Sequence, residues 1–151
     1  MSTASTSPDS AANAVPASTV PVVPTLEDLA LFRDMAADDR HALNLAGKTQ
    51  TVAAGELLIE DGGHHDSLFV VLGGQLEVTR DAEVLAEIGV GQICGEMEML
   101  NPPYSTANVT AIDECVVWRL TRERMRQFME THPKAGAALM KLMAQTFAAR
   151  L

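Results

Sequence analysis

Between Lys48 and Leu120 the apolar residues repeat with the period of β-strands, and this pattern constrains the fold more than any other feature of the chain. The apolar runs are short, and Gly-, Asp- and Asn-containing turns separate them. Two of the runs, Ser67–Leu72 and Gln75–Arg80, flank the tight turn Gly73-Gly74 and are expected to pair with each other. Many short strands at close spacing predict an antiparallel β-roll, of the barrel or jelly-roll kind.

Helical patterns precede this β-rich part. Thr25 is expected to cap a first helix that carries Leu26 and Leu29, with acidic residues in its first turn. A second short helix is expected over about Asp38–Ala46 and should stop at Gly47. These two helices should cover one side of the strands.

Two more helices are expected after the strands. Thr121 suits the N-cap of the first, and Pro133 suits the opening position of a last helix that runs to the C-terminus. The apolar stripe of the last helix contains Ala135, Leu139, Leu142, Thr146 and Ala149, widened by Ala138, Met143 and Phe147. The stripe suits packing on the helix's own barrel, and it equally suits a seam with a partner protein or a second subunit.

The chain outside these patterns is simple in composition. Residues 1–24 are mostly Ser, Thr, Ala, Pro and Val with Asp9 as the only charge, so we expect a disordered tail followed by one domain over residues 25–151. No apolar run approaches the roughly 20 residues of a membrane span. The tail holds no Lys or Arg, which argues against a secretory signal, so the expected compartment is the cytoplasm.

The net charge of −9 is unevenly distributed. Acidic residues outnumber basic ones strongly from Thr25 to Leu120, whereas basic residues dominate from Thr121 to Leu151. An acidic body repels nucleic acid phosphates, and the basic segment lacks the interleaved aromatic residues of a single-strand binder. We therefore expect no DNA binding by this chain.

The stretch Gly91–Ala111 combines a glycine turn, a short helix, a proline-broken loop and a strand. Its glycines allow tight turns, Glu96–Leu100 suits one helical turn, and Asn101–Pro103 ends it. Such a turn presents unpaired backbone N–H groups at its start, where an anion can bind. The same pattern also occurs where a short helix merely closes a β-barrel.

With this order of elements, the chain resembles the cyclic-nucleotide-binding domain family, typified by the cyclic-AMP receptor protein, over about Leu26–Leu151. The landmarks of the resemblance are Gly55-Glu56, Glu60–Gly62 followed by Asp66–Phe69, Leu72–Val78 and Gly91–Glu96. The resemblance implies a β-roll with flanking helices, and it makes Gly91–Ala111 the counterpart of the family's phosphate-binding cassette. In that family the cassette helix holds the cyclic phosphate, a glutamate binds the ribose 2′-hydroxyl, and an arginine pairs with the phosphate.

Two residues of the cassette depart from the family's pattern. Gly95 and Glu96 match it, but the position of the phosphate arginine falls on Ser105, and Glu98 stands where the family usually has a small residue. Loss of a buried arginine–phosphate contact costs about 2–5 kcal/mol, and Glu98 would repel a phosphate at the helix start. The candidate ligand-binding residues are Gly95, Glu96, Met97, Glu98, Ser105 and Thr106.

These departures favour a non-enzymatic regulatory or interaction domain that binds cyclic nucleotide weakly or not at all. The alternative is a domain that senses cyclic AMP or cyclic GMP and signals through its C-terminal helices. A sensor of iron, haem or redox state on the same fold is a third interpretation. No cofactor follows from the sequence with certainty.

Other chemistry is poorly supported by the sequence. Cys94 and Cys115 suit small buried hydrophobic positions, although Cys94 could be reactive because it directly precedes a helix start. The adjacent His64 and His65 do not by themselves form a metal site. No arrangement of nucleophile and base is evident, so we expect no enzymatic activity.

Overall fold

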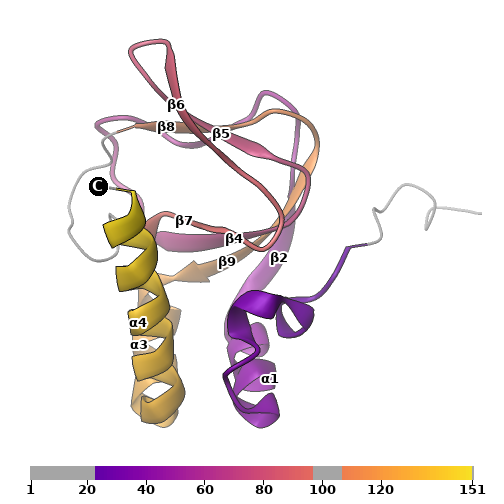
Figure 1. Ribbon diagram of the computed structural model, residues 1–151, viewed down its shortest axis with the longest axis vertical. Helices are drawn as coiled ribbons and strands as arrows, with labels where there is room; N and C mark the ends of the chain where they lie inside the picture. Colours follow the sequence, from indigo (N-terminus) through magenta and orange to yellow (C-terminus); the bar gives the residue numbers. More distant parts are fainter. Residues whose placement is uncertain (1–22, 97–106, 151) are drawn as a thin grey trace, which may run out of the picture.

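The computed structural model describes residues 23–96 and 107–150, and it places two four-stranded antiparallel sheets above a layer of helices (Figure 1). The proposed disordered tail therefore lies outside the described residues except for Val23 and Pro24. None of the described helices has the length and hydropathy of a membrane span. The bounds of the elements are η3 Leu26–Asp28, η4 Ala30–Phe32, α1 Ala37–Ala46, β2 Lys48–Val52, β3 Leu57–Ile59, β4 Ser67–Gly73, β5 Leu76–Arg80, β6 Glu83–Ile88, β7 Ile93–Cys94, β8 Asn108–Ala111, β9 Cys115–Thr121, α3 Arg122–Thr131 and α4 Pro133–Ala149.

The strand order is β2-β9-β4-β7 in one sheet and β3-β8-β5-β6 in the other. All the pairings are antiparallel, so the predicted β-roll with flanking helices is confirmed. The first sheet lies against the helices, and the second lies farther from them (Figure 1). The space between the sheets is the interior of the roll.

The predicted pairing across Gly73-Gly74 is wrong. Strand β4 pairs with β9 and β7, whereas β5 pairs with β6 and β8 in the other sheet. Gly74 has a φ of +79°, a conformation open to glycine, and the chain crosses there from one sheet to the other. Two apolar runs around a glycine pair have the local pattern of a hairpin. In the folded domain, however, β4 forms its long antiparallel pairing with β9.

The hairpin in this region instead joins β5 and β6. Its turn residues Asp81 and Ala82 have φ of 51° and 67°, which is the backbone of the turn type that matches strand twist. The resulting hairpin places β6 at the edge of its sheet.

The N-terminal helices differ in part from the prediction. Instead of one helix after Thr25, the chain forms two 3₁₀ turns, η3 and η4, because Leu29 between them is extended, with φ −77° and ψ 136°. The second predicted helix is confirmed as α1, which ends before Gly47. Leu43 of α1 is fully buried, while Leu45 is 64% exposed.

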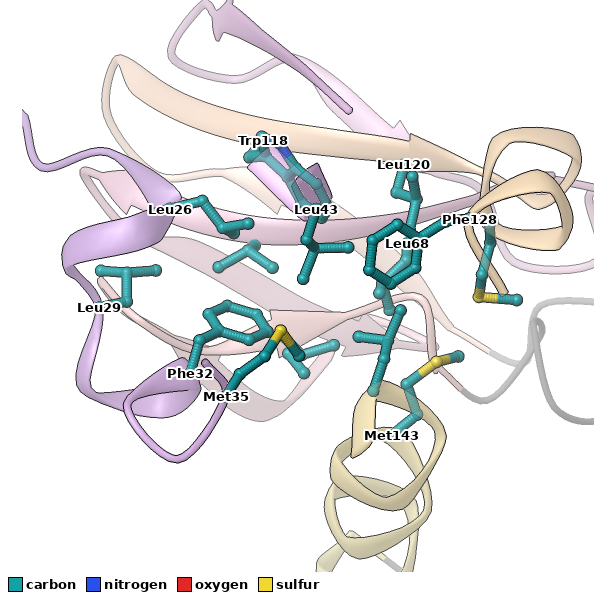
Figure 2. Packing of buried hydrophobic residues seen from close by; sticks show 14 of the residues in the cluster. Leu26, Leu29, Phe32, Met35, Leu43, Leu68, Trp118, Leu120, Phe128 and Met143 are labelled. Atoms are coloured by element: carbon teal, nitrogen blue, oxygen red, sulfur yellow. The ribbon is translucent and has the colours of Figure 1, made fainter. Parts of the chain in front are cut away.

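The hydrophobic core has two parts, one on each face of the β2-β9-β4-β7 sheet. Alternate residues of β4 and β9 point to opposite faces, which explains why both strands are buried along almost their whole length. The part facing the helices holds Trp118, Leu68 and Phe128, and Figure 2 shows Met143 of α4 pointing into it. The part inside the roll is made by Val52, Ile59, Phe69, Val71, Leu76, Ile88, Cys94, Val109, Ala111, Cys115 and Val117.

The C-terminal helices follow the prediction closely. The side chain of Thr121 accepts a hydrogen bond from the Arg124 amide at 3.2 Å, which is the expected N-cap of α3. Pro133 occupies the first position of α4. Leu139 and Met143 are fully buried against the domain's own core, so much of the α4 stripe packs within the domain.

Candidate ligand-binding pocket

A cavity of about 410 Å³ opens into the roll. Its walls come from the inner face of the β3-β8-β5-β6 sheet, from the end of β7 and from the last turn of α4, and the lining residues are Ile59, Val78, Arg80, Leu85, Ala86, Ile88, Cys94, Gly95, Glu96, Ala107, Val109, Ala149 and Arg150. The walls are mainly apolar, with a few charged groups, as is usual for small-molecule sites. Two of the predicted site residues, Gly95 and Glu96, lie in this wall.

Gly95 turns the chain from β7 into the start of the cassette helix. Its φ is +85°, and a Cβ at this position would lie 2.6 Å from the carbonyl oxygen of Ser67 and 3.1 Å from a ring carbon of His65. Strand β4 therefore approaches the backbone of Gly95 more closely than any side chain would allow. This packing fixes where the next residue, Glu96, enters the pocket.

Glu96 is almost completely enclosed, with 1% of its surface exposed. Its Oε1 accepts a hydrogen bond from Nη1 of Arg150 at 2.8 Å, and Nη2 of the same guanidinium donates to the carbonyl oxygen of Ile93 at 2.6 Å. The two side chains form an ion pair between the segment that follows β7 and the C-cap residue of α4. A buried carboxylate needs such compensation, because an unpaired charge away from water is costly.

Arg150 was missed by the sequence analysis. A signal was available, because Arg150 lies seven residues after Met143 and four after Thr146, and so it continues the stripe that faces the domain. A positively charged side chain on the face of a helix that packs against the domain needs an acidic or hydrogen-bonding partner there. Nothing in the sequence identifies Glu96 as that partner.

Arg80 was also missed. It follows Leu76 and Val78 at alternate positions of β5, so its side chain lies on the inner face of the sheet and lines the pocket. The charged groups among the described lining residues are thus Arg80, Arg150 and Glu96. Two of them are positive and one is negative, and Arg150 and Glu96 neutralise each other.

The remaining predicted site residues are Met97, Glu98, Ser105 and Thr106, and they lie outside the described residues. The structure therefore brings together Gly95 and Glu96 and leaves the other four as predictions. The serine at position 105 is a fact of the sequence.

The two cysteines are both buried, as expected from the sequence. Cys94 lines the pocket, and Cys115 belongs to the same core inside the roll. Burial raises the pKa of the Cys115 thiol above its ordinary value, so this thiol remains protonated and unreactive at neutral pH. Within residues 23–96 and 107–150, no three His, Cys, Asp or Glu side chains are grouped as a metal site would require.

A charged cluster at the start of β4 fixes the strand that supports Gly95. The Ser67 hydroxyl donates to Asp66 at 2.9 Å, and Arg119 donates through Nε to Ser67 at 2.6 Å and through Nη2 to Asp66 at 3.2 Å. These contacts lower the pKa of Asp66, with the Ser67 hydrogen bond as the largest cause and Arg119 as a further one. The cluster therefore ties β4 to β9.

Comparisons with known proteins agree with this geometry. Residues 49–132 match the family model described as "Cyclic nucleotide-binding domain". The crystal structure of a cyclic nucleotide-binding domain from Methylobacillus flagellatus KT has the same fold, with a TM-score of 0.75 and 24% identity, covering 83% of this chain and 74% of that one. The regulatory domain of Toxoplasma gondii PKA, co-crystallised with cAMP, has a TM-score of 0.60 and 27% identity over 69% of this chain and 41% of that one.

Among curated proteins, the cGMP-dependent protein kinase egl-4 of Caenorhabditis elegans is 33% identical over 94 residues, which is 59% of this chain. The matched part is 12% of the kinase, so the chain spans about a tenth of this relative's length. The family model covers residues 49–132, more than half of the 151 residues. The chain therefore belongs to the cyclic nucleotide-binding domain family.

Proposed function

We propose that this chain is a non-enzymatic regulatory module whose pocket binds cyclic nucleotide weakly or not at all. The observation that carries the proposal is the ion pair between Glu96 and Arg150. Glu96 stands where the family's resemblance places the ribose-binding carboxylate, and its Oε1 is already bonded to the domain's own α4. A ligand hydroxyl would have to share this buried carboxylate with a guanidinium that already satisfies part of its hydrogen-bonding capacity.

The sequence of the cassette supports the same conclusion. Ser105 stands at the position of the phosphate arginine, and a serine hydroxyl cannot neutralise a phosphate. Truncation of a buried charge-paired contact typically costs about 2–5 kcal/mol, which is roughly 30- to several-thousand-fold in affinity. Two of the three groups through which the family recognises the cyclic ribose phosphate, the glutamate and the arginine, are thus expected to bind less well here.

The alternative is a domain that senses cyclic AMP or cyclic GMP. Three observations favour it: the pocket of about 410 Å³, the presence of Arg80 among its lining residues, and the relatives named for cGMP dependence or crystallised with cAMP. In this alternative Arg80 would supply the positive charge that Ser105 lacks. The two functions differ in affinity, so a titration separates them.

The test is calorimetric titration of the purified chain with cyclic AMP and with cyclic GMP. We expect no binding tighter than tens of micromolar, a rough value that follows from the missing guanidinium. Nanomolar binding of either nucleotide would refute the proposal and establish the sensing alternative.

A double substitution tests the cause of the weakness. Ser105→Arg with Glu98→Ala restores a cation and removes a competing carboxylate, so it should raise the affinity for both nucleotides. Thr110→Arg is the matched control, because Thr110 lies between the inward-facing Val109 and Ala111 on β8 and places the same charge outside the roll. Equal affinities for the two variants would mean that charge at the cassette does not limit binding.

We also propose that the module acts in the cytoplasm through a protein partner or through self-association by α4. The exposed Met140 on α4 supports an outer apolar contact beyond the residues packed on the core. Light scattering of the purified chain tests self-association. A clean monomer at high concentration would leave a different protein as the partner.

A further inference from the structure

The described wall of the roll pocket consists mostly of hydrocarbon. Its most buried lining residues are Ile59, Ile88, Cys94 and Val109, with at most 6% of the surface of each exposed. The other aliphatic side chains of the wall belong to Val78, Leu85, Ala86, Ala107 and Ala149. A wall of this kind attracts a ligand through the apolar surface that both remove from water.

The wall offers few hydrogen bonds. Among the lining residues in the described part of the chain, none is Ser, Thr, Tyr, Asn, Gln, His or Trp. A purine and a ribose each carry several donors and acceptors, and burial of such groups without partners is unfavourable. The wall therefore suits a ligand with few polar atoms.

The charged side chains of the wall lie near opposite charges. Glu96 is paired with Arg150 at 2.8 Å. Arg80 is exposed at the end of β5 and lies opposite Glu83 in the register of the β5-β6 hairpin, which projects beyond the rest of its sheet (Figure 1). These four charges cancel, and residues 97–106 contain no Lys, Arg or His in their sequence. An anionic ligand would therefore gain little from net charge at this site.

Small side chains leave the space in which a ligand could lie. Three of the lining residues are alanines, and they come from three places in the fold: Ala86 from β6, Ala107 from the residue before β8, and Ala149 from the last turn of α4. The resulting cavity of about 410 Å³ is within the size range of small-molecule sites. Apolar cavities hold water poorly and take up apolar molecules of matching size.

We propose that the roll pocket binds an uncharged, largely hydrocarbon small molecule, held by contact with its aliphatic wall. The proposal names the ligand class of the pocket described above, and it rests on the proposed function, in which cyclic nucleotide binds there weakly or not at all. Binding of this kind depends on buried apolar area. It should therefore change little with salt concentration, in contrast to the binding of an anion.

The first experiment compares two fluorescent probes with the same aromatic skeleton. N-phenyl-1-naphthylamine is uncharged, and 8-anilino-1-naphthalenesulfonate adds one sulfonate to it. Each probe is titrated into the purified full chain, and the rise of its fluorescence gives the dissociation constant. The uncharged probe should saturate at one molecule per chain and should bind about tenfold or more tightly than the sulfonate, because the wall does not compensate a buried charge.

Equal or tighter binding of the sulfonate would overturn the proposal and would indicate an anion site that includes Arg80. No binding of the uncharged probe would also overturn it. So would binding without saturation, because that behaviour reports non-specific association with exposed apolar surface.

A pair of variants tests whether the probe lies in the pocket. Val78→Trp places an indole in the pocket from the inner face of β5, whereas Thr79→Trp places it on the outer face of the same strand. Val78→Trp should weaken binding of the uncharged probe about tenfold or more, since even one extra methylene in an apolar pocket has an effect of that order. Thr79→Trp should match the wild type. Equal affinities in the two variants would overturn the assignment to the pocket.

Circular dichroism checks that both variants fold. The comparison of the two probes uses the wild-type chain, so the proposal remains falsifiable if Val78→Trp does not fold. The two proposals also fail separately. Tight binding of cyclic AMP or cyclic GMP refutes the proposed function, whereas weak nucleotide binding together with failure of the uncharged probe refutes only the ligand class inferred from the wall.

Discussion

Replacement of Gly95 by alanine should destabilise the domain through two effects that the structure separates. The first is conformational: φ is +85°, and an L-residue in the left-handed region costs about 1–2 kcal/mol. The second is steric, because the new Cβ would lie 2.6 Å from the Ser67 carbonyl oxygen. That carbonyl belongs to β4, where Ser67 is paired with Thr121 of β9, so it cannot move away freely. Overpacking of this kind adds about 1–3 kcal/mol.

Gly91→Ala is the matched control for the conformational effect. Gly91 lies four residues upstream in the same stretch, has a φ of +84°, and has no atom within 4 Å of its added Cβ. Gly91→Ala should therefore lose only the free energy that the left-handed backbone costs, without any loss from a steric clash. The difference between the two variants isolates the close approach of β4 to the cassette start.

The assay is urea denaturation followed by the fluorescence of Trp118, the only tryptophan of the chain and a fully buried residue of β9. We expect Gly95→Ala to lose about 1–3 kcal/mol more than Gly91→Ala. If the two variants lose the same free energy of unfolding, the contact between Gly95 and the Ser67 carbonyl does not constrain the domain. The account of how Glu96 is positioned would then be wrong.

Two further predictions concern residues that contact β9 of the β2-β9-β4-β7 sheet. Gly47→Ala should lower the free energy of unfolding by about 1–3 kcal/mol, because its Cβ would lie 2.6 Å from Nε1 of the buried Trp118 ring. The loss should be smaller in a Trp118→Phe background, with unfolding followed by circular dichroism. An equal loss in both backgrounds would contradict the clash. Asp66→Asn should cost less than about 1 kcal/mol at pH 7, since the side chain is 65% exposed and screened by solvent. The pKa of Asp66 in the folded protein lies below its ordinary value of 3.8. The stability that its carboxylate contributes is therefore present above pH 3.8 and is lost as the pH falls through the folded pKa. The free energy of unfolding lost in Asp66→Asn, measured by urea denaturation, should thus be smaller at pH 3 than at pH 7. An unchanged cost would show that the charge of Asp66 does not contribute.

The local pattern of the sequence was enough to predict the fold class. Short alternating runs report which residues face the core, and glycines such as Gly91 and Gly95 mark turns that need positive φ, which the structure confirms at both positions. The caps at Thr121 and Pro133 depend only on neighbouring residues, and both were predicted correctly. The glycine pair at Gly73-Gly74 was misread for the same reason, since a turn signal says where the chain bends but not which strand lies beside it.

The sequence by itself determined the β-roll, because short alternating runs report which residues face the core. Its motifs also carry the resemblance to the cyclic nucleotide-binding domain family, and Ser105 is read directly from the sequence. Only the tertiary structure decided that β4 pairs with β9 and that Arg150 reaches Glu96. Strand pairing and long-range ion pairs depend on the tertiary packing of the whole chain. The sequence contains many strands and charged residues of similar chemistry that could pair with any one of them. For this reason Arg150, the partner of the candidate ligand-binding carboxylate of Glu96, was found in the folded structure and not in the sequence of the cassette.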